Sequence, residues 1–198
     1  MPIEVVYYMF SKGDLKKRLQ FQLISQCAPF LKGIKVASIL NIEEKGREEL
    51  PEIFEGTDIS YEVLTTAKGR CLVLFYREET LKEHLQKSDV QEFLEPYGYK
   101  FSNVTNVLSH LKSRVEQYSR KDICFPHEIG AFLDYPIDDV KCFMEEESKE
   151  PLLIGYWKVY NHPERARMTF TAYDKAKDHA VNEFLMGKSL REIVYHAA

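Results

Sequence analysis

The feature that most constrains the fold of this chain is an uninterrupted apolar run from Cys71 to Tyr76. Such a run suits a strand that is buried on both faces, because a strand with one solvated face alternates apolar and polar residues. The preceding segment, Ile59 to Thr65, does alternate, and Ala67-Lys68-Gly69 between the two is a turn sequence. We therefore expect an antiparallel hairpin whose second strand lies at the centre of a sheet.

Strand and helix patterns are interspersed along the rest of the chain. Further strands are expected at Val5–Phe10, Ile34–Ile42 and Leu152–Tyr160, and the acidic segment Glu43–Glu55 is expected to be a surface helix or loop. Capping residues and apolar periodicity predict helices after Asp14 and ending at Pro29, at 79–86, after Ser88, after Ser102, from Pro163 to Gly187, and after Ser189. The pattern predicts an α+β fold with a mainly antiparallel sheet of about four strands packed with helices.

The 198 residues are expected to form one domain. The alternative is a division near residues 121–125 into an α/β part, 1–120, and a mostly helical part, 125–198. In both arrangements we expect the helical C-terminal half to return one strand to the main sheet. The sequence contains no phosphate-binding loop and no dinucleotide-binding glycine motif, so a nucleotide-binding fold is not indicated.

Two short helices are predicted within Cys124–Met144. One is expected over Pro126–Leu133, and Pro136 can open the second, because proline is tolerated in the first turn of a helix. The spacing resembles a helix-turn-helix, but the second helix begins with Asp138 and Asp139, whereas phosphate contacts need Lys or Arg. We expect this helix pair to be a packing unit, and helix-turn-helix DNA binding is the weakest of the alternatives.

Composition and charge limit the classes of partner. The net charge of −4 gives no general attraction to nucleic acid or to anionic membranes, so neither is expected as a partner. The apolar segment Met1–Phe10 is too short for a membrane span and lacks signal-peptide features, so a cytoplasmic location is expected. The four cysteines form no Cys-x-x-Cys pair, so the sequence indicates no metal site, and no cofactor is indicated.

The candidate functional residues lie near the first of the two short helices and in the aromatic strand. His127 is expected to stay neutral at a helix N-terminus, where it can donate a hydrogen bond or act as a base. Glu128 can orient His127 or simply complement the helix dipole. Lys158 and Tyr160 are expected on the exposed face of a strand, where they offer a cation beside an aromatic ring, and Trp157 on the buried face. For all these residues, ordinary packing roles are the plainer alternative.

Two functional hypotheses follow from these residues. The leading one is a non-catalytic protein that binds an unknown small molecule or another protein, with its site between His127 and the Lys158/Tyr160 strand. The alternative is a hydrolase or transferase in which His127 is the general base, Glu128 orients it or acts as an acid, and Lys158 stabilises an anion. An enzyme would need His127 exposed in a pocket with a second titratable group in hydrogen-bond reach.

Several segments together carry a family resemblance. They are Phe-Pro-His-Glu-Ile-Gly-Ala-Phe-Leu at 125–133, Tyr-Pro at 135–136, Asp-Asp-Val at 138–140, Gly-Tyr-Trp-Lys-Val-Tyr at 155–160, and Gln-Cys-Ala-Pro at 26–29. The chain resembles the bacterial DUF3793 family, a domain of unknown function, so the resemblance implies a bacterial protein but no activity.

The resemblance also draws attention to Cys27. The family usually has His where this chain has Gln26, and often Cys where it has Ile154, so a thiol or metal site built from those positions would lack two of its parts here. Cys27 is kept as a candidate site residue, and a buried structural thiol is the plainer interpretation.

Overall fold

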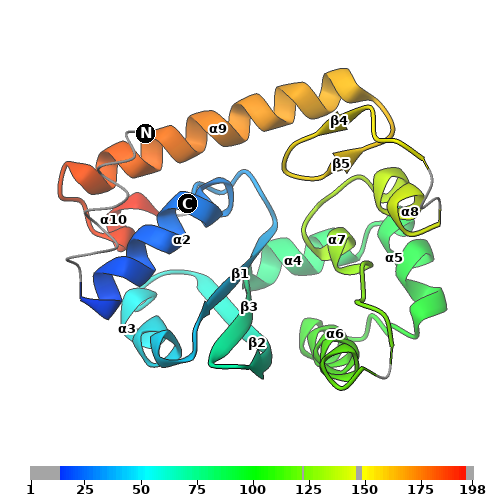
Figure 1. Ribbon diagram of the computed structural model, residues 1–198, viewed down its shortest axis with the longest axis horizontal. Helices are drawn as coiled ribbons and strands as arrows, with labels where there is room; N and C mark the ends of the chain where they lie inside the picture. Colours follow the sequence, from blue (N-terminus) through cyan, green and yellow to red (C-terminus); the bar gives the residue numbers. More distant parts are fainter. Residues whose placement is uncertain (1–13, 122, 146–148, 195–198) are drawn as a thin grey trace.

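The computed structural model describes residues 14–121, 123–145 and 149–194, so the strand expected at Val5–Phe10 lies outside the described residues. In chain order the elements are α2 (Leu15–Leu31), β1 (Ala37–Glu43), η1 (Glu44–Glu49), α3 (Leu50–Ile53), β2 (Ile59–Ala67), β3 (Arg70–Arg77), α4 (Glu78–Leu85), α5 (Ser88–Leu94), η2 (Glu95–Tyr97), α6 (Val104–Ser119), α7 (Ile129–Phe132), α8 (Ile137–Glu145), β4 (Leu153–Ile154), β5 (Lys158–Val159), α9 (Pro163–Leu185) and α10 (Leu190–Ile193). Figure 1 shows α9 lying along one side of the molecule beside α2, with the hairpin β4–β5 at one end of α9 and next to α7 and α8.

The central sheet has three antiparallel strands in the order β1-β3-β2. Val73 in β3 lies opposite Leu40 of β1 on one side and Val63 of β2 on the other. Lys68 and Gly69, which connect β2 to β3, both have positive φ angles, as two-residue hairpin turns with the favourable twist require. The predicted hairpin and its central second strand are confirmed.

The two faces of β3 pack into two different hydrophobic cores. Val73 and Phe75 point into a core that includes α2, the end of α9 and α10. Leu74 points into a second core that is built mainly from α4, α5, α6, α7 and α8. The absence of alternation in the Cys71–Tyr76 run therefore has the expected cause, burial on both faces.

Helix α2 continues past the point where the sequence predicted its end. Pro29 lies inside the helix, which ends at Leu31. The guanidinium of Arg77 donates hydrogen bonds to the carbonyl oxygens of Phe30 (2.8 Å) and Leu31 (3.3 Å), which satisfies the end of the helix. The prediction that α2 stops at Pro29 is wrong, because a distant arginine stabilises the additional residues.

The predicted caps of α2 at Asp14 and of α10 at Ser189 are confirmed, whereas α5, α6 and α7 begin at other residues than predicted, α7 at Ile129 instead of Pro126. Asn103, not Ser102, caps α6, and its side chain accepts a hydrogen bond from the Asn106 backbone N–H. Lys87, not Ser88, precedes α5. Ser189 opens α10 with the predicted capping box.

The acidic segment is helical, but part of it belongs to the core. Its apolar residues Leu50, Ile53 and Phe54 are buried, while most of its glutamates are solvent-exposed. The charge pattern therefore predicted the exposed face of this segment correctly but did not reveal its buried apolar face.

The C-terminal strands depart from the expected topology. β4 pairs only with β5, so the described part of the C-terminal half returns no strand to the central sheet, which has three strands instead of about four. The chain reverses direction within Leu152–Tyr160, where the backbone N–H of Gly155 donates to the carbonyl oxygen of Trp157 at 3.1 Å. A Cβ on Gly155 would lie 2.2 Å from Cε2 of Phe170, so this tight turn against α9 needs glycine. The α+β fold class is confirmed.

Helix α9 connects the sheet region to the C-terminal hairpin. Its end packs Ala180 and Val181 against α2 in the first core, and its start lies beside the hairpin β4–β5 (Figure 1). None of the helices within the described ranges has the length and apolarity needed to cross a membrane.

Candidate functional site

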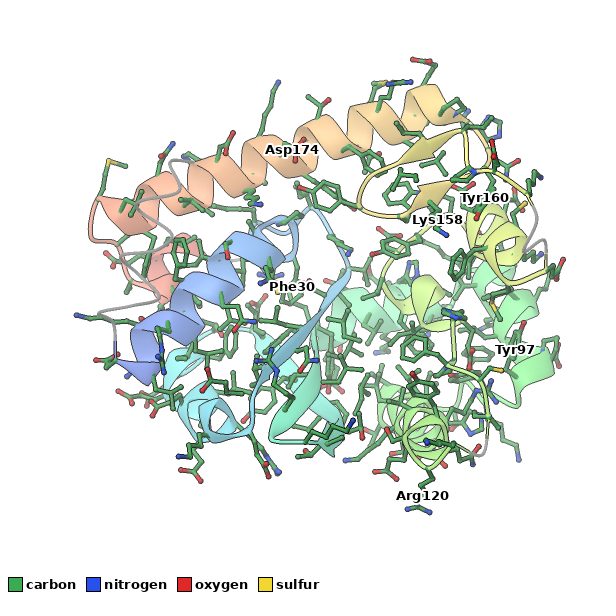
Figure 2. All side chains as sticks on the ribbon, viewed as in Figure 1. Phe30, Tyr97, Arg120, Lys158, Tyr160 and Asp174 are labelled. Carbon is green, nitrogen blue, oxygen red and sulfur yellow. The ribbon has the colours of Figure 1, made fainter. Side chains whose placement is uncertain are left out.

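A hollow of about 300 Å³ lies between α7, α8 and the hairpin β4–β5. Its lining is mostly apolar and comes from His127, Ile129, Gly130, Leu133, Tyr135, Asp139, Val140, Phe143, Trp157 and Lys158. Figure 2 shows Lys158 beside α8 at the end of the molecule where the hairpin lies. We refer to this hollow as the α7–α8 pocket.

The pocket exists because α7 and α8 meet at a tight turn. Asp134 has a φ of 58°, and the backbone N–H of Tyr135 bonds back to the carbonyl oxygen of Gly130 at 3.1 Å. A Cβ on Gly130 would lie 2.9 Å from Cγ2 of Val140, so the glycine lets the two helices approach. The aromatic side chain of Tyr135 is then free to form one wall of the pocket.

The carboxylate of Asp139 attaches α8 to the segment that follows β5. Its Oδ1 accepts from the backbone N–H of Tyr160 (2.9 Å), the backbone N–H of Asn161 (2.8 Å) and the Asn161 side-chain amide (3.3 Å). Its Oδ2 accepts from Nε1–H of Trp157 at 2.8 Å. Asp139 is only 2% exposed. This one side chain therefore fixes both the hairpin and the indole ring that lines the pocket.

Aromatic rings form the wall of the pocket on the hairpin side. Trp157 stacks on Tyr135 with ring centroids 5.3 Å apart and an interplanar angle of 30°. Phe170 of α9 packs edge-on against Trp157 at 4.5 Å. The ammonium of Lys35 lies 4.9 Å from the centroid of the Tyr135 ring. The wall is thus a packed stack that offers flat apolar surface to the pocket.

His127 and Lys158 provide nitrogen atoms at the edge of the pocket. The imidazole packs edge-on between Phe125 (5.1 Å) and Phe143 (4.8 Å), and the Lys158 ammonium lies 5.1 Å from the centroid of the same Phe143 ring. Partial burial lowers the pKa of His127, and the nearby charge of Glu128 only partly opposes this effect. The direction of this shift favours the neutral imidazole, and its cause is burial and not a helix dipole, since α7 begins only at Ile129.

Glu128 points away from His127 into the second core. It is fully buried, and its Oε1 accepts hydrogen bonds from Nε–H of Arg114 and, at 3.3 Å, from the hydroxyl of Tyr99. Its Oε2 has no hydrogen-bond partner among the described residues. The same Arg114 guanidinium lies 5.5 Å from the centroid of the Tyr97 ring. Glu128 thus anchors α6 to the start of α7 and does not orient the imidazole.

The other two candidates lie outside the pocket. Tyr160 is only 6% exposed, because β5 contains just two residues and its alternation does not extend to position 160. Cys27 is buried in the first core, and burial raises the pKa of its thiol to about 11, against weaker opposing effects of Ser38 and Lys35. Of the five sequence candidates, the structure brings together only His127 and Lys158.

Sequence reasoning missed three residues that shape the site, Asp139, Tyr135 and Phe143, and placed a fourth, Trp157, on the buried face of a strand. Asp139 was predicted only as one of the two aspartates that begin the second helix, and no local pattern marks it as buried, because its donors come from residues 157–161. Tyr135, Phe143 and Trp157 complete the pocket, and only long-range pairing of α8 with β5 brings these rings together. The described ranges contain no group of three or more His, Cys, Asp or Glu side chains arranged to hold a metal ion.

The chain was compared with known proteins. No curated protein matches it, and no solved structure does. A family model described as "protein of unknown function (DUF3793)" matches residues 23–194, which include the sheet, the α7–α8 pocket and α9. The chain therefore belongs to the DUF3793 family.

Proposed function

We propose that this protein is a non-catalytic binding protein that holds a small, flat, largely apolar molecule in the α7–α8 pocket. The observation that carries the proposal is the pocket itself, an apolar hollow of about 300 Å³ with a stacked Trp157–Tyr135 wall. This volume is at the lower end of ligand sites, which span roughly 300 to 1,000 Å³, and so suits a ligand of one or two rings. Flat aromatic walls favour a flat ligand because stacked rings gain dispersion and quadrupole energy.

The enzyme alternative has less support. The His127 imidazole has no hydrogen-bond or ion-pair partner in the part of the chain that the structure describes. Glu128, its expected orienting partner, is held by Arg114 instead. A general base needs a partner that fixes its tautomer and orientation, so this arrangement favours binding over catalysis.

We also propose that this protein is bacterial and cytoplasmic, and that it binds neither nucleic acid nor membranes. The four cysteines are free, which fits a reducing compartment. The net charge of −4 disfavours attraction to polyanions and anionic lipid surfaces.

Calorimetric titration with a neutral two-ring probe, 2-naphthamide, tests the binding function. Trp157 is the only tryptophan in the chain, so its indole N–H signal in a proton–nitrogen NMR spectrum reports on the pocket wall. We expect saturable binding that shifts this signal.

A matched pair of variants locates the probe. Phe143→Ala removes a pocket ring and should weaken binding about tenfold, given the apolar contact it loses. Phe101→Ala removes a half-buried ring from a different hollow, between α4 and α6, and should leave the affinity unchanged. Equal losses in the two variants, or no binding by the wild type, would contradict the proposal.

A further inference from the structure

We infer that the ligand of the α7–α8 pocket is an organic monoanion, an aryl carboxylate whose charged group binds between Lys158 and His127. This inference rests on the proposed binding function and adds the chemical class of the ligand. The apolar floor of the pocket would hold the ring system, and the two nitrogen-bearing side chains at the edge would hold the carboxylate.

The first argument is that both side chains have unused hydrogen-bonding capacity. The ammonium of Lys158 and the imidazole of His127 contact the Phe143 ring, and within the described ranges neither has an ion-pair or hydrogen-bond partner. Both side chains contact the same Phe143 ring and line the same pocket, so one ligand can contact both of them. Other lysines, such as Lys32 and Lys112, are instead paired with glutamates.

The second argument is that the nearby carboxylates do not compete for this position. Asp139 lines the pocket, but its two oxygens already accept four hydrogen bonds from Trp157, Tyr160 and Asn161. Glu128 is fully buried and is paired with Arg114. A ligand carboxylate would therefore be the acceptor that the Lys158 ammonium lacks.

The number of donors favours a carboxylate over a phosphate. At pH 7 the edge of the pocket supplies one full positive charge, from Lys158, and one neutral N–H donor, from His127, whose pKa is lowered mainly by burial. Phosphate sites in proteins are typically built from bidentate arginines or from a glycine-rich loop at a helix N-terminus, with lysine as an additional point charge. The pocket is not lined by arginine, and α7 has only four residues. One ammonium and one imidazole N–H match the two oxygens of a carboxylate.

The arrangement also predicts how binding depends on pH. When the pH falls through the lowered pKa of His127, the imidazole gains a proton and a second positive charge. The charged groups around it are Lys158, which contacts the same Phe143 ring, Asp139 with all its donors in place, and Glu128 paired with Arg114. The added charge should strengthen binding of an anion and leave binding of a neutral analogue nearly unchanged.

The test compares 2-naphthoate with 2-naphthamide, which share a ring system and differ in charge. Calorimetric titration at about pH 7.5 and about 0.15 M salt should give an affinity for the naphthoate about tenfold higher, which is the usual size of one charge-assisted contact. As the pH is lowered toward about 5, where the naphthoate is still ionised, its affinity should rise further by a few-fold, because a bound carboxylate favours the protonated imidazole of His127.

Variants then assign the preference to individual side chains. Lys158→Gln should bring the ratio of the two affinities close to one, and Lys158→Arg should restore the preference. Lys175→Gln removes an exposed lysine from α9 and should change neither affinity. His127→Gln should remove the extra affinity at low pH.

The outcomes separate the inference from the proposed function. Equal affinities of the wild type for the two probes would overturn the monoanion inference and leave the binding function standing. A preference for the naphthoate that survives in Lys158→Gln would also overturn it. Absence of binding by both probes would contradict the proposed function, and the inference with it.

Discussion

The central sheet and the α7–α8 pocket are stabilised in different ways. The sheet region is built from strands of seven to nine residues, and its central strand packs apolar side chains into a core on each face. The pocket region is built from helices of four and nine residues and strands of two residues. Its elements are too short to fix one another through backbone pairing alone. Polar side chains, above all Asp139, supply the missing connections.

The contrast explains where the pocket lies. A sheet with a core on each face fills its interior, because apolar side chains close-pack. A region positioned by a few directional hydrogen bonds can keep a hollow, since hydrogen bonds fix the backbone without requiring the space between the elements to be filled. The comparison predicts that the two regions respond differently to substitutions.

The largest effect is expected in the sheet. Val73 is fully buried between two neighbouring strands, so Val73→Asp would place an unpaired carboxylate in the first core. This substitution should lower the free energy of unfolding by more than about 4 kcal/mol, so the variant should not fold. Glu55→Ala, at an exposed position of the same region, should change stability by less than about 0.5 kcal/mol. Circular dichroism and thermal melting would measure both, and similar melting curves would refute the description of β3 as a central strand.

The second largest effect is expected at the pocket. Asp139→Ala removes the acceptor of four hydrogen bonds and leaves buried donors unpaired, at a cost of roughly 1 to 3 kcal/mol for each donor that cannot reach water. Asp138→Ala removes the same charge from the exposed neighbouring position and should cost less than about 1 kcal/mol. Urea unfolding gives both values. If the pocket is independent of Asp139, the Asp139 variant will bind 2-naphthamide with the wild-type affinity.

A smaller effect is expected from acid at the junction of α2 and α9. Burial alone would raise the pKa of Glu183, but hydrogen bonds from Lys188 (2.7 Å) and Lys32 outweigh it and lower the pKa to about 2. A carboxylate whose pKa is lowered on folding stabilises the fold above its unfolded pKa, near 4.5, and loses this contribution as the pH falls toward 2.

The test compares the wild type with Glu183→Gln between about pH 7 and about pH 3. The wild type should lose more of its free energy of unfolding over this range than the variant does. Glu164→Gln, at an exposed position of the same helix, should lose as much as the wild type. A Glu183→Gln variant with the wild-type pH dependence would show that the two lysine contacts contribute no pH-dependent stability.

The sequence predicted the fold well where local patterns determine structure. The continuous run Cys71–Tyr76 and the Lys68-Gly69 turn identified the hairpin and its central strand, because burial and turn geometry act over a few residues. The end of α2 was missed because Arg77, far along the chain, satisfies its last carbonyl oxygens. The segment Leu152–Tyr160 resembled one strand, since aromatic residues suit strands, and the reversal at Gly155 depends on the ring of Phe170, distant in sequence, which leaves no room for a Cβ there.

The site was predicted less completely than the fold. His127 and Lys158 were expected to lie near each other, and both line the pocket. Glu128 was expected beside His127, but neighbours along a short helical turn point in different directions, and Arg114 holds its carboxylate. Asp139 was predicted only to lie at the start of a helix, because its four donors come from residues 157–161, which no local pattern connects to α8.

The smallest effect is expected for DNA: the protein should show no measurable binding to duplex DNA. The helix-turn-helix pattern would make α8 a recognition helix, but α7 has only four residues and Asp139, in the first turn of α8, is buried against the hairpin. The exposed surface of α8 carries Asp138 and Glu145 against Lys141. Carboxylates facing phosphate oppose binding, so a gel-shift titration on mixed-sequence duplex at about 0.15 M salt should detect no complex.

The two adjacent aspartates make this experiment more informative. Asp139→Ala would perturb the pocket and could change binding indirectly, whereas Asp138 is exposed and tests the helix surface alone. A recognition helix would bind duplex more tightly once the Asp138 charge is removed, and Lys141→Ala would weaken that binding. Tight binding with this pair of responses would mean that α8 reads DNA. Without it, the short helices serve to hold Asp139 and the pocket rings in place, which is the role that distinguishes this region from the sheet.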